Sequence, residues 1–203
     1  MAVYKLTPTK ANLIKSKNSL QFAKKGYELL DRKRTVLIRE MMSLIDKASE
    51  LQERIDTEFK QAYEALKLAN ITMGTESVEE IAGSIEKEQD FHILFKSVMG
   101  VEVPMIKRED TKLTTEYGFF RTNPAFDKAV LNFSDIRKLI YDLAEIENSV
   151  YKLAMEIKKT QKRANALDKI QIPKYTTTIK YLEEVLEEKE REDFFRLKRV
   201  KGK

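Results

Sequence analysis

Apolar residues recur every three or four positions from Leu13 to Ala69. Stepping by seven along this stretch, and again from three residues further on, samples seventeen positions, of which fourteen are apolar. The overall apolar content of 42% would give only about seven. The positions are Leu13, Ser16, Leu20, Ala23, Tyr27, Leu30, Arg34, Leu37, Met41, Leu44, Ala48, Leu51, Ile55, Glu58, Ala62, Ala65 and Ala69. This a/d heptad pattern predicts one coiled-coil helix from Pro8 to near Ala69, about 90 Å long.

A second stripe with the same spacing lies in the last third of the chain. Asn123-Pro124 favours a helix start, with a capping side chain followed by a proline. Nine of ten a/d positions are then apolar: Ile136, Leu139, Leu143, Ile146, Val150, Leu153, Ile157, Thr160, Ala164 and Leu167. Beyond Leu167 the stripe fades and resumes one residue later, and Pro173 removes a helix hydrogen bond. We therefore predict a kink or local unwinding near Pro173.

The two stripes predict an all-α fold, a long antiparallel coiled coil formed by the N- and C-terminal helices of one chain. Its parts are an N-terminal helix (1–73), a middle region (74–123) and a C-terminal helix (124–203), with the two long helices forming one elongated domain. Thr7-Pro8 is the expected start of the first helix, and Gly26 indicates a close contact with a neighbouring backbone rather than a stop. If Ala69 lies opposite Asp135 in this coiled coil, the numbers of any two residues that face each other add up to about 204.

The middle region has a different pattern. Ser77 and Glu80 fit a capping box, which predicts a short helix from there to about Met99. The β-favouring runs Val101–Ile106 and Leu113–Phe119 predict a small hairpin, with Pro104 keeping its strand at an edge.

Composition narrows the function classes. The 203 residues are 35% charged with six Gly, four Pro and no Cys, which favours long helices and excludes thiol chemistry and disulfides. No apolar run approaches 18 residues and no secretion signal is visible, so we expect a cytoplasmic protein without direct membrane insertion. A net charge of +5 is modest for a nucleic-acid binder, and no nucleic acid is expected as a partner.

Residues for chemistry are lacking. The sequence contains no phosphate-cradling glycine loop of the usual kinds. His92 is the only histidine, and adjacent carboxylates such as Glu79-Glu80 and Glu183-Glu184 diverge around a helix. We predict no catalytic, cofactor-binding or metal-binding residues, and no enzyme activity for the chain by itself.

Three features remain as candidates for partner contact. The first is a basic collar, in which the predicted pairing gathers Arg32, Lys33, Arg34, Arg39, Lys158, Lys159, Lys162, Arg163 and Lys169; it is either a solvated surface or a face for an acidic partner. The second is Phe194 and Phe195, which either pack against Leu13, Val3 or Tyr4 or enter an apolar socket on another protein. The third is the predicted hairpin, which is either a plain connector or, with Phe119 and Phe120 beside its edge strand, a docking surface.

Several motifs resemble the D subunit of the V-type and archaeal A-type rotary ATPases and ATP synthases. Pro8-Thr9-Lys10 with Asn12-Leu13 resembles P-T-K-x-N-L, and Gly26 to Arg34 resembles G-x-x-L-L-x-x-K-R. Lys159 to Leu167 is similar to K-T-x-x-R-V-N-A-L, with Ala164 in place of Val. The stretches 172–181 and 191–198 are also similar to the family. Together, these motifs occur in order on two heptad helices.

The resemblance implies a central rotor shaft that transmits torque between the catalytic hexamer and the ion-translocating ring. Its implied partners are the catalytic A and B subunits, the F subunit, and the C/d subunit at the membrane ring, with one copy of the chain on the cytoplasmic face of each complex. It implies proton- or sodium-ion transport without chemistry on this chain. A non-rotary tethering coiled coil is the alternative function, and a basic rod for nucleic acid or membrane ranks below it.

Overall fold

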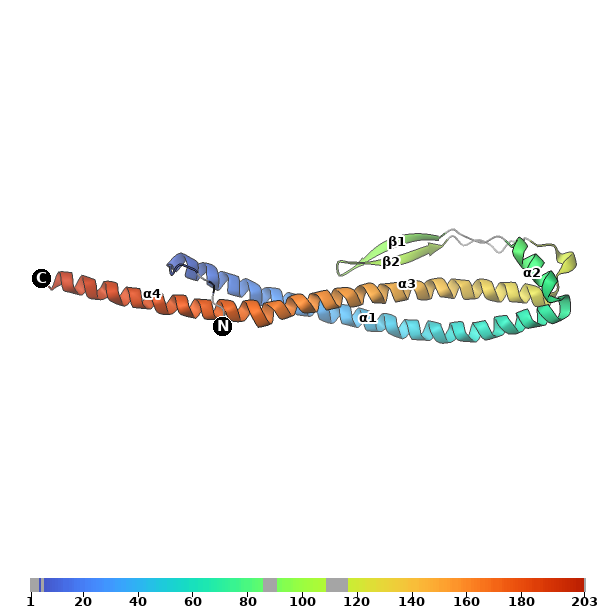
Figure 1. Ribbon diagram of the computed structural model, residues 1–203, viewed down its shortest axis with the longest axis horizontal. Helices are drawn as coiled ribbons and strands as arrows, with labels where there is room; N and C mark the ends of the chain where they lie inside the picture. Colours follow the sequence, from blue (N-terminus) through green and yellow to red (C-terminus); the bar gives the residue numbers. More distant parts are fainter. Residues whose placement is uncertain (1–3, 5, 86–90, 109–116, 203) are drawn as a thin grey trace. The chain divides into compact units, whose positions relative to one another are not determined.

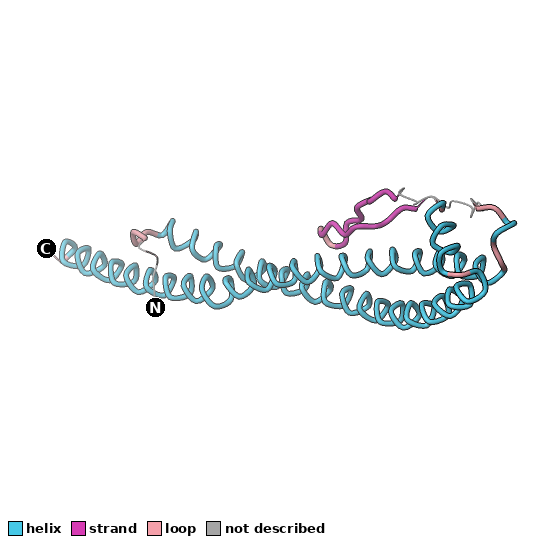
Figure 2. The backbone as a smooth tube through the Cα atoms, turned by 45° about the vertical axis from the view of Figure 1, so that its right-hand side comes forward, coloured by secondary structure: helices cyan, strands magenta, loops and turns pink. Residues whose placement is uncertain are grey.

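The computed structural model describes residues 4, 6–85, 91–108 and 117–202, and most of them are helical (Figures 1 and 2). The elements are α1 (Lys10–Met73), α2 (Thr75–Ser84), β1 (Phe91–Val98), β2 (Val101–Arg108), the 3₁₀ turn η1 (Phe119–Arg121), α3 (Pro124–Ala166), the π-helical segment η2 (Leu167–Gln171) and α4 (Ile172–Lys201). This order confirms the predicted fold class: two long helical arms with a short helix and a hairpin between them.

The chain forms two compact units. The terminal unit comprises Met1–Leu37 and Glu156–Lys203, and the central unit comprises Ile38–Met155. In the terminal unit the first part of α1 contacts the end of α3, η2 and α4. In the central unit the rest of α1 contacts α3, α2 packs against both helices, and the hairpin contacts α3. Each unit therefore contains segments from both long helical arms, packed antiparallel.

Both long helices are capped by a side chain. The hydroxyl of Thr9 accepts a hydrogen bond from the backbone N–H of Asn12 at 3.2 Å, so Thr9 caps α1 and the predicted cap at Thr7 is wrong. Thr7 instead accepts a hydrogen bond from the Asn12 side chain. Asn123 caps α3 as predicted, because its Oδ1 accepts the N–H of Phe126 at 2.9 Å.

The predicted heptad seams are confirmed. All seventeen a/d positions of α1 are buried or half-buried, as are all ten on α3 and η2. Leu37 and Ala62 on α1 are 0% exposed, and Ile136 and Leu153 on α3 are 1% exposed. Outside these stripes the helices are largely solvent-exposed, so the hydrophobic stabilisation of each unit is concentrated along one narrow seam.

A π-helical turn occurs just before Pro173, where local unwinding was predicted. Leu167–Gln171 takes this conformation, and a π turn holds one residue more than an α turn. The apolar stripe resumes one residue late at Ile179 and Leu182, yet both are buried, at 8% and 0% exposure. The wider turn absorbs the extra residue and returns the stripe to the seam.

The predicted pairing register is wrong by one turn or more. A sum of 204 would place Glu187 opposite Lys17, whereas Lys17 Nζ lies 2.6 Å from Oε1 of Glu183. Gly26, still inside α1, faces the side chain of Leu167, not a backbone. Heptad stripes fit one another in several registers, because the pattern repeats every seven residues.

The middle region differs most from the prediction. Helix α2 begins at Thr75 with Gly74 before it and no side-chain cap, so the Ser77–Glu80 capping box does not form. The helix ends at Ser84, and the residues expected to continue it as far as Met99 include strand β1. Val78 of α2 packs in a buried cluster with Ala69 of α1 and Phe126 of α3, which ties this end of the central unit together.

The hairpin pairs different segments from those predicted. Val101–Ile106 is a strand, but its partner is Phe91–Val98 on the preceding side. Of the expected second strand, 113–116 lies outside the described residues, and the remainder forms a bend leading into η1. Met99 and Gly100 have φ values of 52° and 78°, the paired positive angles of a type I′ hairpin turn. Pro104 lies in an edge strand, as predicted.

Candidate functional site

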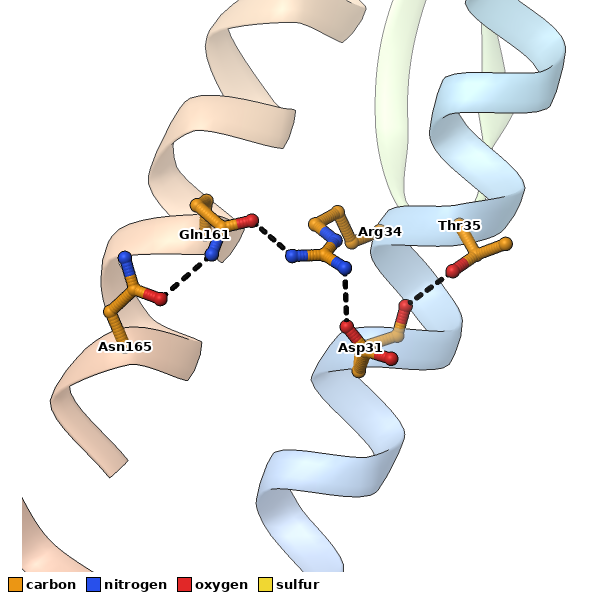
Figure 3. A network of polar contacts seen from close by, with 5 residues as sticks. All are labelled: Asp31, Arg34, Thr35, Gln161 and Asn165. Atoms are coloured by element: carbon orange, nitrogen blue, oxygen red, sulfur yellow. Dashed lines mark hydrogen bonds and ion pairs between the residues drawn. The ribbon is translucent and has the colours of Figure 1, made fainter. Parts of the chain in front are cut away.

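The best-defined part of the basic collar is a polar crossing in the terminal unit. Arg34 occupies an a/d position of α1, and its guanidinium lies 2.7 Å from Asp31 Oδ1. It also donates a hydrogen bond to Oε1 of Gln161, which in turn donates to Asn165 at 2.8 Å (Figure 3). The seam at this level is thus held by hydrogen bonds, not by apolar packing.

The contacts at this crossing leave one nitrogen atom of Arg34 without a hydrogen bond. Its Nε atom is buried without a hydrogen-bond partner among the described residues, which carries a desolvation cost. An aliphatic residue at this heptad position would avoid that cost. Arg34 therefore adds polarity and directional contacts to a seam that packing alone would stabilise.

The other collar cations divide into paired and free groups. Glu156 lies 3.4 Å from Lys33 Nζ and 3.9 Å from Lys159 Nζ, so one carboxylate on α3 serves both lysines. Arg32, Lys162 and Arg163 are exposed and have no ion pair within the described part of the chain. The structure therefore brings Lys33 and Lys159 together around Glu156, a carboxylate that the sequence analysis missed although it lies three residues before Lys159.

Tyr4 anchors the N-terminal segment to η2 and α4. Its hydroxyl donates to Oε1 of Gln171 at 2.6 Å, and its backbone N–H donates to the hydroxyl of Thr178 at 3.1 Å. The ring lies 5.0 Å from that of Tyr175, and Lys174 Nζ lies 3.9 Å from its centroid. The sequence offered no signal for this anchor, because the first residues follow no periodic pattern.

An open apolar groove of about 880 Å³ lies beside this anchor. It is bounded by α1 on one side and by η2 and α4 on the other, and Ile14, Phe22, Leu167 and Tyr175 line it. Phe22 is 79% exposed.

Phe194 and Phe195 point into solvent near the end of α4. Their rings are 6.2 Å apart at a steep angle and are 64% and 66% exposed. Tyr4, one of their predicted packing partners, contacts Lys174 and Tyr175 instead. In the central unit, Phe119 and Phe120 are also exposed and belong to η1, not to a strand.

Ionic contacts near the chain termini join the two arms of the terminal unit. Lys10 Nζ lies 2.8 Å from Glu190 Oε1. This hydrogen bond and the attraction between the charges raise the pKa of Lys10 and lower the pKa of Glu190. Both side chains are exposed, so the pair orients the arms without adding a buried contact.

The side chains of the described residues narrow the possible chemistry. They include no cluster of three or more His, Asp or Glu positioned to hold a metal ion. Nor does any helix in this part of the chain have a stretch long and apolar enough to cross a bilayer.

Known proteins place this pattern of helices in a family. The profile of the family described as the D subunit of ATP synthase matches residues 12–202. The chain belongs to the ATP synthase D-subunit family. It is 48% identical over 198 residues to the V-type ATP synthase D subunit of Thermotoga neapolitana, covering 98% of each chain.

Archaeal family members are also similar over nearly their whole length. The A-type ATP synthase D subunit of Thermococcus sibiricus is 38% identical, covering 98% of this chain and 95% of the relative. That of Methanopyrus kandleri is 39% identical, covering 97% of this chain and 85% of the relative. Membership confirms the resemblance drawn from the motifs and makes the chain a component of a complex for ATP synthesis and ion transport.

Proposed function

We propose that this chain is the central rotor shaft of a V/A-type ATPase or ATP synthase. One copy transmits torque between a hexamer of catalytic A and B subunits and the ion-translocating ring in the membrane. The paired helices bind the F subunit, and the shaft meets the ring through the C/d subunit on the cytoplasmic face. The chain performs no chemistry itself.

The observation that carries this proposal is the antiparallel pairing of the N- and C-terminal arms in a protein of this family. A heptad seam excludes water and resists separation of the helices when a neighbouring protein pushes on one of them. Directional contacts such as Arg34 with Gln161 add resistance to sliding, because a hydrogen bond has a narrow range of productive geometries.

Exposed cations supply the proposed contact with the catalytic subunits. Arg32, Lys162 and Arg163 are free to face acidic loops, whereas Lys33, Arg34 and Lys159 are engaged within the terminal unit. This division predicts that the first three determine salt-dependent partner contact, and that the second three mainly hold the two arms together. Phe194 and Phe195 supply an exposed apolar tip for a socket in the hexamer.

Rotation tests the proposal directly. The chain has no cysteine, so a single cysteine on the exposed part of α2 gives one attachment point for a gold particle. In a surface-fixed complex supplied with ATP, the particle should rotate in one direction as ATP is hydrolysed. A stationary particle during full ATP turnover would reject the shaft and favour the tethering alternative.

Charge neutralisation tests the collar. The triple variant Arg32→Gln, Lys162→Gln and Arg163→Gln should bind the catalytic hexamer at least ten-fold more weakly at 0.15 M salt, with a flatter salt dependence. The matched control neutralises Lys47, Lys60 and Lys67, exposed cations on α1 in the central unit. Equal loss in the two variants would mean that net charge, not the collar, governs binding.

A further inference from the structure

The hairpin is attached to α3 by the outer edge of β2. The backbone N–H of Ile106 donates to Oε2 of Glu145 at 2.7 Å. The Arg108 guanidinium pairs with Asp142 and donates to the backbone carbonyl of Lys138 at 2.9 Å. Helix α3 therefore occupies the edge that β2 would otherwise offer to another strand.

Strand β1 touches α3 only through side chains on one face. The Phe91 ring lies 5.7 Å from that of Tyr141, and Lys152 Nζ lies 4.8 Å from the centroid of Phe95. All residues of β1 except Val98 are exposed, including Phe95 at 62%. The hairpin is thus fixed on one side and open along β1.

The register identifies which backbone groups point outward from that open edge. In an antiparallel pair, hydrogen-bonded and non-hydrogen-bonded residue pairs alternate. Ile106 donates away from β1, so its opposite residue, Ile93, also directs its N–H and C=O outward. The same holds for Phe91 and Phe95, and Pro104, which has no N–H, lies opposite Phe95.

An exposed edge of this kind is a template for another strand. The described sheet has two strands only, and the outward groups of Phe91, Ile93 and Phe95 have no backbone partner among the described residues. A segment that paired there would gain main-chain hydrogen bonds and cover exposed apolar side chains.

The charges on the hairpin indicate which kind of segment would pair with β1. The cations Lys96 and Lys107 lie on one face of the ribbon, which also carries His92 and the exposed side chains of Leu94 and Met105. Lys96 and Lys107 have no ion pair with any described carboxylate. The opposite face presents the apolar side chains of Phe91, Ile93 and Phe95. An incoming strand that matched both faces would alternate acidic and apolar residues.

We propose that β1 is a docking edge for an extended segment of another protein that alternates acidic and apolar side chains. The segment adds a third strand to the hairpin, while Glu145 and Asp142 hold β2 against α3 and keep β1 accessible. A second copy of this chain is the less favourable occupant, because β1 carries Lys96 and no acidic residue that could pair with the Lys96 of another copy.

Peptide binding tests the proposal on the full-length chain. The probe is a fluorescein-labelled peptide of alternating glutamate and valine, seven residues long, and fluorescence anisotropy measures its binding. It should bind, and replacing its glutamates by lysines should weaken binding at least ten-fold. Absence of binding by the acidic peptide, or equal binding by the two, would overturn the proposal.

Backbone methylation separates edge pairing from simple charge attraction. Only alternate amides of a docked strand face β1, so methylating one alternating set should abolish binding, and methylating the other set should leave it within about two-fold. Equal effects of the two sets would overturn the edge geometry.

A protein variant locates the site. Ile93→Pro removes one outward N–H without removing a hydrogen bond to β2, and it should lower peptide affinity at least ten-fold, whereas Ile93→Val should not. Hydrogen exchange of the hairpin amides checks that the variant keeps its ladder. Light scattering tests whether a second copy of this chain is the occupant. If the free chain dimerises and Ile93→Pro abolishes the dimer, the edge pairs two copies of this chain. Undiminished peptide binding by a folded Ile93→Pro variant would likewise reject the edge.

Discussion

Leu167 packs against Gly26, with its Cδ1 atom 3.7 Å from the position that a Cβ on residue 26 would take. This spacing is ordinary van der Waals contact, so Gly26→Ala adds a methyl group without a clash. Glycine inside a helix costs about 0.5–1 kcal/mol relative to alanine. We expect Gly26→Ala to raise the free energy of unfolding by that amount, measured by urea denaturation.

Two variants serve as controls for Gly26→Ala. Gly83 lies in α2, and no atom lies within 4 Å of the position that a Cβ would take there, so Gly83→Ala reports helix propensity without a packing change. Gly26→Leu should instead lower stability by about 1–3 kcal/mol, because Leu167 would have to move. A loss of stability in Gly26→Ala would contradict the assigned contact.

Arg34 is expected to be replaceable by an apolar residue at no cost to stability. Arg34→Leu removes a half-buried guanidinium with a buried, unsatisfied Nε and restores an apolar heptad position, so the free energy of unfolding should stay the same or rise by about 1 kcal/mol. Arg34→Ala is the comparison, and it should lower stability by about 1 kcal/mol through lost packing. Thermal unfolding monitored by circular dichroism gives both values.

The same substitution should impair function if the crossing resists sliding of the helices. Complexes containing Arg34→Leu should hydrolyse ATP but couple hydrolysis less well to ion transport. An Arg34→Leu chain that is less stable than Arg34→Ala would show that the polar crossing is a net source of stability.

Tyr117 gives the central unit a dependence on alkaline pH. Burial first, and then its hydrogen bond of 2.9 Å to Asp127 and the nearby carboxylate charge, raise the pKa of Tyr117 to about 12. The unfolded chain ionises this phenol near pH 10. The stabilisation is therefore fully present below pH 10 and is lost as the pH rises toward 12.

Tyr117→Phe isolates this effect from the titration of lysines. At pH 8 the variant should be less stable than the parent chain by about 1 kcal/mol, through loss of the hydrogen bond. The difference should shrink as the pH is raised from 10 to 12. Urea unfolding of both chains at matched pH measures it, and a difference that stays constant with pH would refute the raised pKa.

The Tyr4 hydroxyl should stabilise the π turn. Tyr4→Phe keeps the ring contacts with Lys174 and Tyr175 but removes the hydrogen bond to Gln171, at a cost of about 1 kcal/mol. Hydrogen exchange at the amides of η2 should then speed up by about five-fold, since RT is about 0.6 kcal/mol. Amides of α1 around Leu37 provide the internal control, because that residue is fully buried and does not contact Tyr4.

The long helices were predictable because their signal is redundant. A coiled-coil seam repeats over many turns, so Arg34 and Glu58 on the first stripe do not obscure it. The start of α1 was misplaced by two residues because Thr7 and Thr9 are both capping residues, and only the actual path of the chain selects between them. Relative register was not encoded in the repeat, and contacts such as Lys17 with Glu183 determine it.

The hairpin was mispredicted for a different physical reason. Phe91, Leu94, Phe95 and Val98 have the spacing of an apolar helix face, and Gly100 follows where a helix would end. In the folded chain this segment is a strand instead. Contacts from α3, such as Glu145 with Ile106, contribute to that outcome, and they come from a part of the chain that local patterns do not include.

Nor could the sequence predict which cations of the basic collar form ion pairs within the chain and which remain exposed. Lys33 and Arg32 are adjacent cations and look equivalent in the sequence, yet Lys33 turns toward Glu156 and Arg32 remains in solvent. The direction of each side chain depends on the rotation of α1 against α3, which follows from the register.

The π turn at Leu167–Gln171 takes up one extra residue without changing which side of α4 faces α1. One residue advances an α-helix by about 100°, so an uncorrected extra residue would turn the apolar side of α4 away from α1 for the rest of its length. The turn confines that phase error to five residues. The residues beyond it, including Phe194 and Phe195, lie on the same sides of the helix as they would in an uninterrupted heptad repeat.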